Sequence, residues 1–194
     1  MRRVGLTGGI GSGKSTIAQI LKQMGYPVYI ADKQAARLMN EDPGVRKKMI
    51  CKFGASIYTE KNVLDRQRLA SIIFDNKEAL VAVNSIVHPR VMEDFRQWCQ
   101  KQNARLVFFE SAILYEAGLE DFFESVVCVS APPAIRIERV VARDHTSSEQ
   151  VKERMANQLD DREKCRQSDF VILNDEEHPV IEQVLRMVDQ LEVC

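Results

Sequence analysis

The sequence has no long apolar run, and no stretch of it approaches the roughly 20 residues that a membrane-spanning helix needs. Its first residues, Met1-Arg2-Arg3, are like the start of a signal peptide, but the long apolar segment that should follow is missing. Both absences argue against a membrane protein and against export. We therefore expect a soluble, cytoplasmic protein with no membrane partner.

The sequence also lacks an excess of positive charge, since 27 Lys and Arg stand against 28 Asp and Glu and the net charge is −1. Proteins that bind nucleic acids or anionic membranes through general electrostatics usually carry a basic excess. We therefore expect no nucleic-acid partner. Any binding of an anion must come from a local cluster of residues.

The five cysteines provide neither a disulfide framework nor a zinc site, because their number is odd and no two are spaced as C-x-x-C. Reduced thiols in a cytosolic protein are the simpler interpretation. At 194 residues, the chain has the length of one domain with room for an inserted lobe.

Short runs of apolar, β-branched and aromatic residues predict five strands, at residues 4–7, 28–30, 106–109, 126–129 and 170–173. Helical patterns lie between and after them, at residues 14–24, 132–143, 147–159 and 179–191. Strands that are apolar throughout are typical of a parallel sheet covered on both faces. The order of elements predicts a three-layer α/β sandwich.

The segment between the second and third predicted strands contains no convincing strand. It predicts helices at residues 33–40, 44–53, 66–74, 76–87 and 89–102, with His88-Pro89 closing one helix and opening the next. Thr146 with Glu149, and Asp75 with Glu78, have the spacing of helix-capping pairs. We expect a core of residues 1–30, 104–146 and 169–194, a helical lobe of residues 31–103, and a lid of residues 147–168.

Directly after the first predicted strand, the residues from Gly8 to Ser15 fit the phosphate-binding pattern G-x-x-x-x-G-K-[ST]. Glycines let successive main-chain N–H groups surround an anion, and the following helix directs its positive end at the phosphates. Lys14 would reach the β- and γ-phosphates, and the Ser15 hydroxyl would ligate Mg²⁺. The alternative, a glycine-rich turn without a ligand, is much the weaker reading. We expect ATP to bind at Gly11, Ser12, Gly13, Lys14, Ser15 and Thr16.

The chain has neither the N-K-x-D pattern of guanine-specific switches nor the L-S-G-G-Q pattern of transporters. A small protein with a helical insertion favours a kinase that encloses a small acceptor, because water competes for the γ-phosphate. Asp32 could accept a proton from the acceptor hydroxyl, or could cap the following helix instead. Glu110, at the end of the third predicted strand, could hold Mg²⁺ or be merely a solvated strand-end carboxylate.

Arg136, Arg139 and Arg143 recur at helical spacing and share one face of the predicted helix. The polar segment that follows holds more positive charge. Such a cluster could neutralise a transferring phosphoryl group from a mobile lid. For any one arginine, a solvated face paired with neighbouring acids is the plainer interpretation. The further cations of this segment are Arg154, Arg162, Lys164 and Arg166.

Together these residues resemble the dephospho-CoA kinase family nearly from end to end. The specific features are Asp65-Arg66-x-x-Leu69 with Ile73-Phe74 and His88-Pro89, Ile30-Ala31-Asp32, Ala112-Ile113-Leu114-Tyr115-Glu116, Arg139-x-x-x-Arg143-Asp144, and the series Gln158, Lys164, Asp169 and Asn174. Two positions depart from the family pattern: Ile30 replaces an acid, and Ala112 replaces a proline. The first implies that this acid is not essential here, and the second puts only a local turn in doubt.

The resemblance implies a P-loop kinase fold with a helical CoA-binding lobe and a lid, and transfer of the ATP γ-phosphate to the ribose 3′-hydroxyl of 3′-dephospho-CoA, the last step of coenzyme A synthesis. We hypothesise that Asp32 orients or deprotonates this hydroxyl while Arg66 and His88 shape the acceptor pocket. Arg139 and Arg143 would clamp phosphates, and Asn174 would lie in an adenine-contacting loop. We expect a monomer or small homo-oligomer.

Two rival hypotheses stay open. One is another small-metabolite kinase, of the nucleoside monophosphate or shikimate type, which would phosphorylate those acceptors instead. The other is a regulatory module that binds ATP without transferring phosphate and docks a protein through its helical lobe; it predicts an exposed apolar patch on that lobe.

Overall fold

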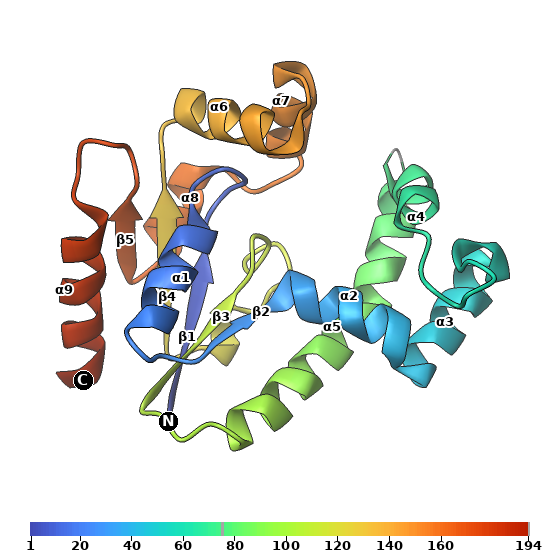
Figure 1. Cartoon of the computed structure of the whole chain (residues 1–194), viewed down its shortest axis with the longest axis horizontal. Helices are drawn as coiled ribbons and strands as arrows, with labels where there is room; N and C mark the ends of the chain where they lie inside the picture. Colours follow the sequence, from blue (N-terminus) through green and yellow to red (C-terminus); the bar gives the residue numbers. More distant parts are fainter. Residues whose placement is uncertain (75, 194) are drawn as a thin grey trace. The chain divides into compact units, whose positions relative to one another are not determined.

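The structure is a computed structural model that describes residues 1–74 and 76–193. Asp75, which we expected to form a capping pair with Glu78, lies outside the described residues. The chain forms two compact units: one consists of Met1–Ile30 and Gln102–Cys194, and the other of Ala31–Lys101 (Figure 1). Each unit is described by itself.

The first unit is built on a parallel sheet of five strands in the order β2-β3-β1-β4-β5. In a parallel sheet all carboxyl ends meet at one edge, which is where α/β proteins bind ligands. That edge therefore carries the segment after β1, which begins the phosphate-binding pattern. The strands are β1 (Arg2–Thr7), β2 (Val28–Ile30), β3 (Leu106–Glu110), β4 (Ser125–Ser130) and β5 (Phe170–Leu173).

Helices and loops cover both faces of this sheet, as its apolar strands require. Ile17 and Leu21 of α1 (Lys14–Gln23) are fully buried in one cluster with Val184 of α9 (Val180–Val193) and strand residues such as Phe108. On the other face, the ring of Phe109 packs against those of Tyr29 and Phe123, with centroids 5.5 and 5.2 Å apart. The remaining helices of this unit are η2 (Glu120–Phe122), α6 (Pro133–Asp144), α7 (Ser148–Ala156) and α8 (Asp161–Gln167).

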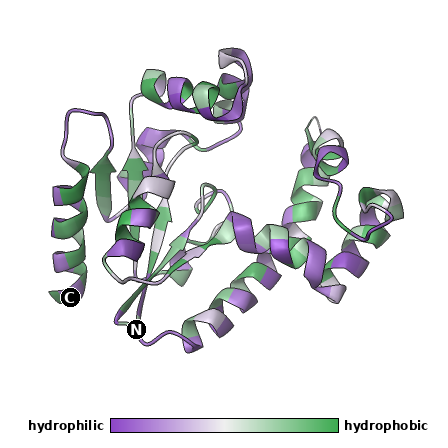
Figure 2. Ribbon diagram, viewed as in Figure 1, coloured by the Kyte–Doolittle hydropathy of each residue, from purple (hydrophilic) through white to green (hydrophobic). Residues whose placement is uncertain are grey.

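Among its described residues, the second unit is built of helices, and an isolated β-bridge pairs Tyr58 with Leu64. Side-chain caps begin three of its helices, since Asp42, Asp65 and Asn76 each accept a hydrogen bond from a main-chain N–H three residues on. Figure 2 shows hydrophilic and hydrophobic residues alternating along them, which is typical of helices with one buried face. The elements are α2 (Ala31–Glu41), α3 (Pro43–Phe53), η1 (Ala55–Ile57), α4 (Arg66–Ile73) and α5 (Lys77–Gln100).

Three local predictions were wrong. Residues 76–87 and 89–102, predicted as separate helices, form the single helix α5 with Pro89 in its interior. The predicted cap Thr146 is displaced by Ser147, whose Oγ accepts from the Gln150 N–H at 3.3 Å. The predicted helix 147–159 ends early, and a separate helix, α8, follows it. Its sequence, DREKCRQ, is too polar to show an apolar period, so a pattern search misses it.

Candidate active site

The loop after β1 turns back sharply to begin α1. Gly13 precedes the first residue of α1 and has φ 96°, a left-handed conformation that side chains rarely adopt. A Cβ atom at Gly13 would also lie 1.9 Å from Asn174 Nδ2. Glycine is therefore required at this position both by the backbone and by the neighbouring loop.

Lys14 is held on the inside of this loop. Its Nζ donates to the carbonyl oxygens of Gly8 at 2.8 Å and Gly9 at 3.1 Å, and the side chain is buried. Because Lys14 begins α1, its ammonium group and the positive end of the helix lie in the same place. This local positive charge, in a protein of net charge −1, suits a polyphosphate.

Most of the residues predicted to bind the nucleotide meet around one cavity. Its volume is about 200 Å³, and Arg139, Val140 and Arg143 of α6 form the wall that faces the loop. Ser12 does not line it, and its side chain is fully buried. The loop and α1 contribute Gly11, Gly13, Lys14, Ser15 and Thr16.

Arg139 and Asn174 link this cavity to the loop after β5. Asn174 Nδ2 donates to the Ser12 carbonyl at 2.9 Å, and Arg139 Nη1 donates to the Asn174 carbonyl at 3.0 Å. Arg139 Nη2 also pairs with Glu176 at 3.1 Å, an exposed carboxylate. Asn174 is thus tied to both the phosphate loop and Arg139, although it does not itself line the cavity.

Arg143 is engaged by an acid next to it in the chain. Its Nε and Nη2 donate to the two oxygens of Asp144 at 2.7 and 3.1 Å. The same carboxylate accepts from Arg154 of α7 at 3.0 Å. Hydrogen bonding from Arg143 is the main cause that lowers the pKa of Asp144. The carboxylate therefore stays ionised and holds α7 against the end of α6.

Ser15 and Glu110 are oxygen donors suited to Mg²⁺. The Ser15 side chain is exposed on the cavity wall. Glu110 ends β3 and is only 6% exposed, so the alternative of a solvated strand-end carboxylate is wrong. Among the described residues there is no group of three or more His, Cys, Asp or Glu that could hold a metal. This donor set fits an ion that keeps waters and phosphate oxygens as its other ligands.

The residues predicted to serve the acceptor lie in the second unit. Asp32 is exposed in the first turn of α2, which begins at Ala31, so it does not cap that helix. Arg66 is the exposed first residue of α4. His88 is half-buried in the middle of α5, and desolvation lowers the pKa of its imidazole.

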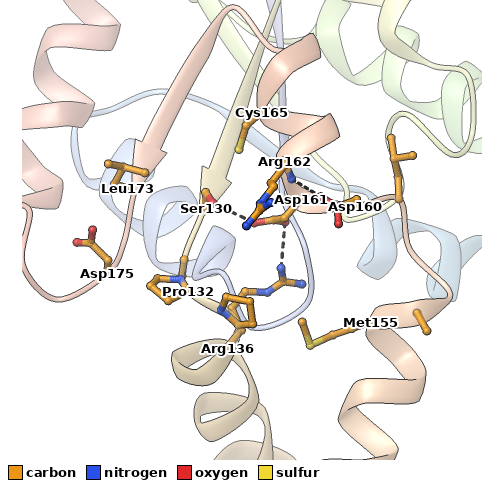
Figure 3. A pocket seen from close by; sticks show the side chains of 14 residues that line it. Ser130, Pro132, Arg136, Met155, Asp160, Asp161, Arg162, Cys165, Leu173 and Asp175 are labelled. Atoms are coloured by element: carbon orange, nitrogen blue, oxygen red, sulfur yellow. Dashed lines mark hydrogen bonds and ion pairs between the residues drawn. The ribbon is translucent and has the colours of Figure 1, made fainter.

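A group of contacts to Gly9 and Ile10, which we call the outer side of the phosphate loop, was not predicted. Asp161 Oδ1 accepts from the Gly9 N–H at 2.9 Å. The same oxygen pairs with Arg136 Nη1 at 3.2 Å (Figure 3). Gln158 Oε1 accepts from the Ile10 N–H at 2.8 Å. Arg136, which we placed with the phosphate-binding arginines, is instead buried and engaged by the protein itself. Gly9 could have indicated that another group lies close to the backbone at this position, because the motif does not require glycine there.

One of the cations expected to serve the phosphates has a structural role instead. Lys164, expected among the cations of the lid, is fully buried, and its Nζ contacts Glu116 Oε1 and the Ala112 carbonyl at 2.7 Å each.

A cavity of about 690 Å³, drawn in Figure 3, is lined by Arg136, Cys165 and Leu173 among others. It shares no lining residue with the 200 Å³ cavity, so we do not assign the triphosphate to it.

Within residues 1–74 and 76–193, no helix is both long and apolar enough to cross a membrane. The family model described as dephospho-CoA kinase matches residues 2–179. A dephospho-CoA kinase of Bacteroides fragilis is 41% identical over 187 residues, which cover 96% of this chain and 91% of that protein.

Solved structures agree with this match. A structure titled TT1252 from Thermus thermophilus has a TM-score of 0.83 and 32% identity, covering 99% of this chain and 96% of its own. Dephospho-CoA kinase from Campylobacter jejuni has a TM-score of 0.70 and 26% identity, covering 97% of this chain and 96% of its own.

Proposed function

The chain belongs to the dephospho-CoA kinase family, and on this basis we propose that it transfers the γ-phosphoryl group of ATP to the 3′-hydroxyl of 3′-dephospho-CoA. The observation that carries the proposal is the match of a single family model to residues 2–179 of a 194-residue chain. A kinase of the nucleoside monophosphate or shikimate type is not favoured, since relatives named dephospho-CoA kinase match 96% and 97% of this chain. The rival of a binding module without transfer is not favoured either, because these relatives are kinases by name.

The first unit supplies the phosphate donor site. Main-chain N–H groups of the loop and the Lys14 ammonium would neutralise the β- and γ-phosphates, where charge develops during transfer. Arg139 and Arg143, on the facing wall, would meet the same polyphosphate. Ser15, and Glu110 directly or through water, would hold Mg²⁺, which when bound would offset the negative charge of the phosphates.

The second unit supplies the acceptor site in this proposal. Asp32 is an exposed carboxylate that, among the described residues, has no hydrogen-bonding or ionic partner of its own, which leaves it available to orient the 3′-hydroxyl. Arg66 would meet an acceptor phosphate, and His88, kept neutral by burial, would offer a hydrogen bond without a charge. We further propose that residues 147–168 act as the lid, in a cytoplasmic enzyme that is a monomer or small homo-oligomer.

The proposal is tested by incubating the protein with Mg-ATP and a panel of acceptors, following ADP release and product mass. We expect turnover with 3′-dephospho-CoA and none with shikimate or nucleoside monophosphates. Asp32→Asn should lower kcat by about 100-fold, because it preserves shape but removes the proton acceptor. Glu41→Gln, at the exposed far end of the same helix, is the matched control and should stay near the parent rate. Asp32→Asn turnover near the parent rate would refute the role of Asp32, and transfer to another acceptor would refute the substrate.

A further inference from the structure

We propose that Asp161 is a positioning residue for phosphoryl transfer: from the start of α8 it fixes the outer side of the phosphate loop in the shape that receives ATP. The inference rests on the proposed function, because it concerns the same nucleotide site. Asp161 contacts no residue that lines the 200 Å³ cavity, so its role would be exerted through the loop.

The Asp161 carboxylate uses both of its oxygens. Oδ1 accepts from the Gly9 N–H at 2.9 Å and faces Arg136 Nη1 at 3.2 Å, while Oδ2 accepts from the Ser130 hydroxyl at 3.0 Å. The side chains of Asp161 and Arg136 are 14% and 5% exposed, so this ion pair is shielded from solvent. Figure 3 shows the carboxylate between Ser130 and Arg136, with α8 leading away from it.

The contacts converge on two consecutive residues of the loop, Gly9 and Ile10. Arg136 Nε donates to the Ile10 carbonyl at 2.9 Å, and Gln158 accepts from the Ile10 N–H at 2.8 Å. With Asp161 on the Gly9 N–H, these side chains therefore fix Gly9 and Ile10 from outside. The N–H groups of these two residues point at protein acceptors, so phosphate must be bound by N–H groups farther along the loop.

The identity of residue 9 supports the same conclusion independently of the hydrogen bonds. The motif permits any residue at this position, and Gly9 does not have the positive φ of Gly8, Gly11 or Gly13. A Cβ at Gly9 would nevertheless lie 2.0 Å from Arg136 Nη2 and 2.7 Å from Asp161 Oδ1. Glycine is needed here because the ion pair lies directly against the backbone.

A loop that binds phosphate through main-chain N–H groups depends on their orientation, and small displacements of such groups reduce rates strongly. Without the Asp161 carboxylate, Arg136 loses its ionic partner and the Gly9 N–H loses its acceptor. We therefore expect a defect in ATP binding and in turnover, with the acceptor site unaffected. The Michaelis constant for ATP and kcat should change, whereas that for 3′-dephospho-CoA should not.

The test compares Asp161→Ala with Asp160→Ala. Asp160 is the neighbouring N-cap of α8, accepts from the Arg162 N–H at 2.8 Å and makes no contact with the loop. Both variants should lower the melting temperature of the protein. Only Asp161→Ala should raise the Michaelis constant for ATP and lower kcat, with a combined loss of about 10- to 100-fold in kcat/KM.

Binding of the non-hydrolysable analogue β,γ-imido-ATP, measured by calorimetry, separates this proposal from the proposed function. If the parent protein binds the analogue but does not phosphorylate 3′-dephospho-CoA, the substrate is wrong and the Asp161 effect is still measurable as weaker binding. Gly9→Ala displaces the ion pair and should reproduce the defect, while Asp161→Asn keeps an oxygen for the Gly9 N–H and should be intermediate. These two variants also decide the question if Asp161→Ala does not fold. The proposal would be overturned if the kcat, the Michaelis constant for ATP and the analogue affinity of Asp161→Ala were all within twofold of those of Asp160→Ala.

Discussion

The buried ion pair between Lys164 and Glu116 gives a prediction in which the two partners respond unequally. Lys164 of α8 is fully buried, whereas the Glu116 side chain is 22% exposed. Their charged atoms lie 2.7 Å apart, and Nζ also donates to the Ala112 carbonyl at 2.7 Å. Glu116 in turn accepts from the Leu159 N–H at 2.9 Å, so the pair connects the segment after β3 to α8.

The size of the effect follows from which charge is left behind. At an effective dielectric constant of about 20, two charges at the 2.7 Å of this pair attract by about 6 kcal/mol, from which the desolvation of both groups must be subtracted. Glu116→Gln keeps a hydrogen bond but leaves an ammonium group with no access to water. We expect it to lower the free energy of unfolding by about 3–5 kcal/mol. Lys164→Met leaves a carboxylate that can be hydrated, and we expect a loss of about 1–3 kcal/mol.

Urea denaturation of the two variants and the parent at pH 7, followed by circular dichroism, measures both losses. A matched control is Glu163→Gln, which removes a partly exposed carboxylate of α8 that is paired with the exposed Arg166, and which should change stability by less than about 0.5 kcal/mol. A Lys164→Met variant that is less stable than Glu116→Gln would refute the reasoning. It would mean that the unpaired Glu116 carboxylate costs more than the unpaired, buried Lys164 ammonium group.

Two further predictions concern the second unit. Burial lowers the pKa of His88, so its protonation is favoured in the unfolded state, and the stability of the protein should fall as pH decreases through the ordinary value of 6.5. In melting curves between pH 7.5 and 5.5, the melting temperature of His88→Gln should therefore fall less than that of the parent. An equal fall in the two proteins would contradict this. Asp42→Ala removes both the hydrogen bond from the Val45 N–H and the 2.7 Å ion pair with Arg90. In a urea titration it should reduce the free energy of unfolding by about 1–3 kcal/mol. The control Glu41→Ala, at an exposed residue, should reduce it by less than about 0.5 kcal/mol. Because hydrogen bonds from Val45 and Arg90 lower the pKa of Asp42, its contribution should disappear as pH falls below its ordinary value of 3.8, and a loss unchanged at lower pH would argue against it.

The sheet and the phosphate loop could be read from the sequence because both depend on local pattern. Each strand contains a short apolar run, and all five strands were located to within two residues at each end. The loop needs particular residue types at fixed spacing, and the structure forms it where the motif stands.

The errors arose where tertiary contacts override local preference. Pro89 was taken to separate two helices, yet α5 continues through it because Val87, Val91 and Met92 are all buried along the helix. Arg136 and Lys164 belong to a charge pattern that resembles a phosphate-binding cluster, but both are buried against acids distant in sequence. No spacing rule predicts such partners, because they meet only when α6 and α8 pack at the sheet.

The order of the strands has a consequence for synthesis on the ribosome. β1 emerges first, but its hydrogen-bonding partners are β3, which pairs Leu106 with Arg2, and β4, which pairs Ser125 with Val4. The central strand therefore stays unpaired until β3, about 100 residues later in the chain, has been made. Meanwhile residues 31–101 can make their contacts among themselves. We expect the nascent chain to acquire its helical segment before its nucleotide-binding sheet.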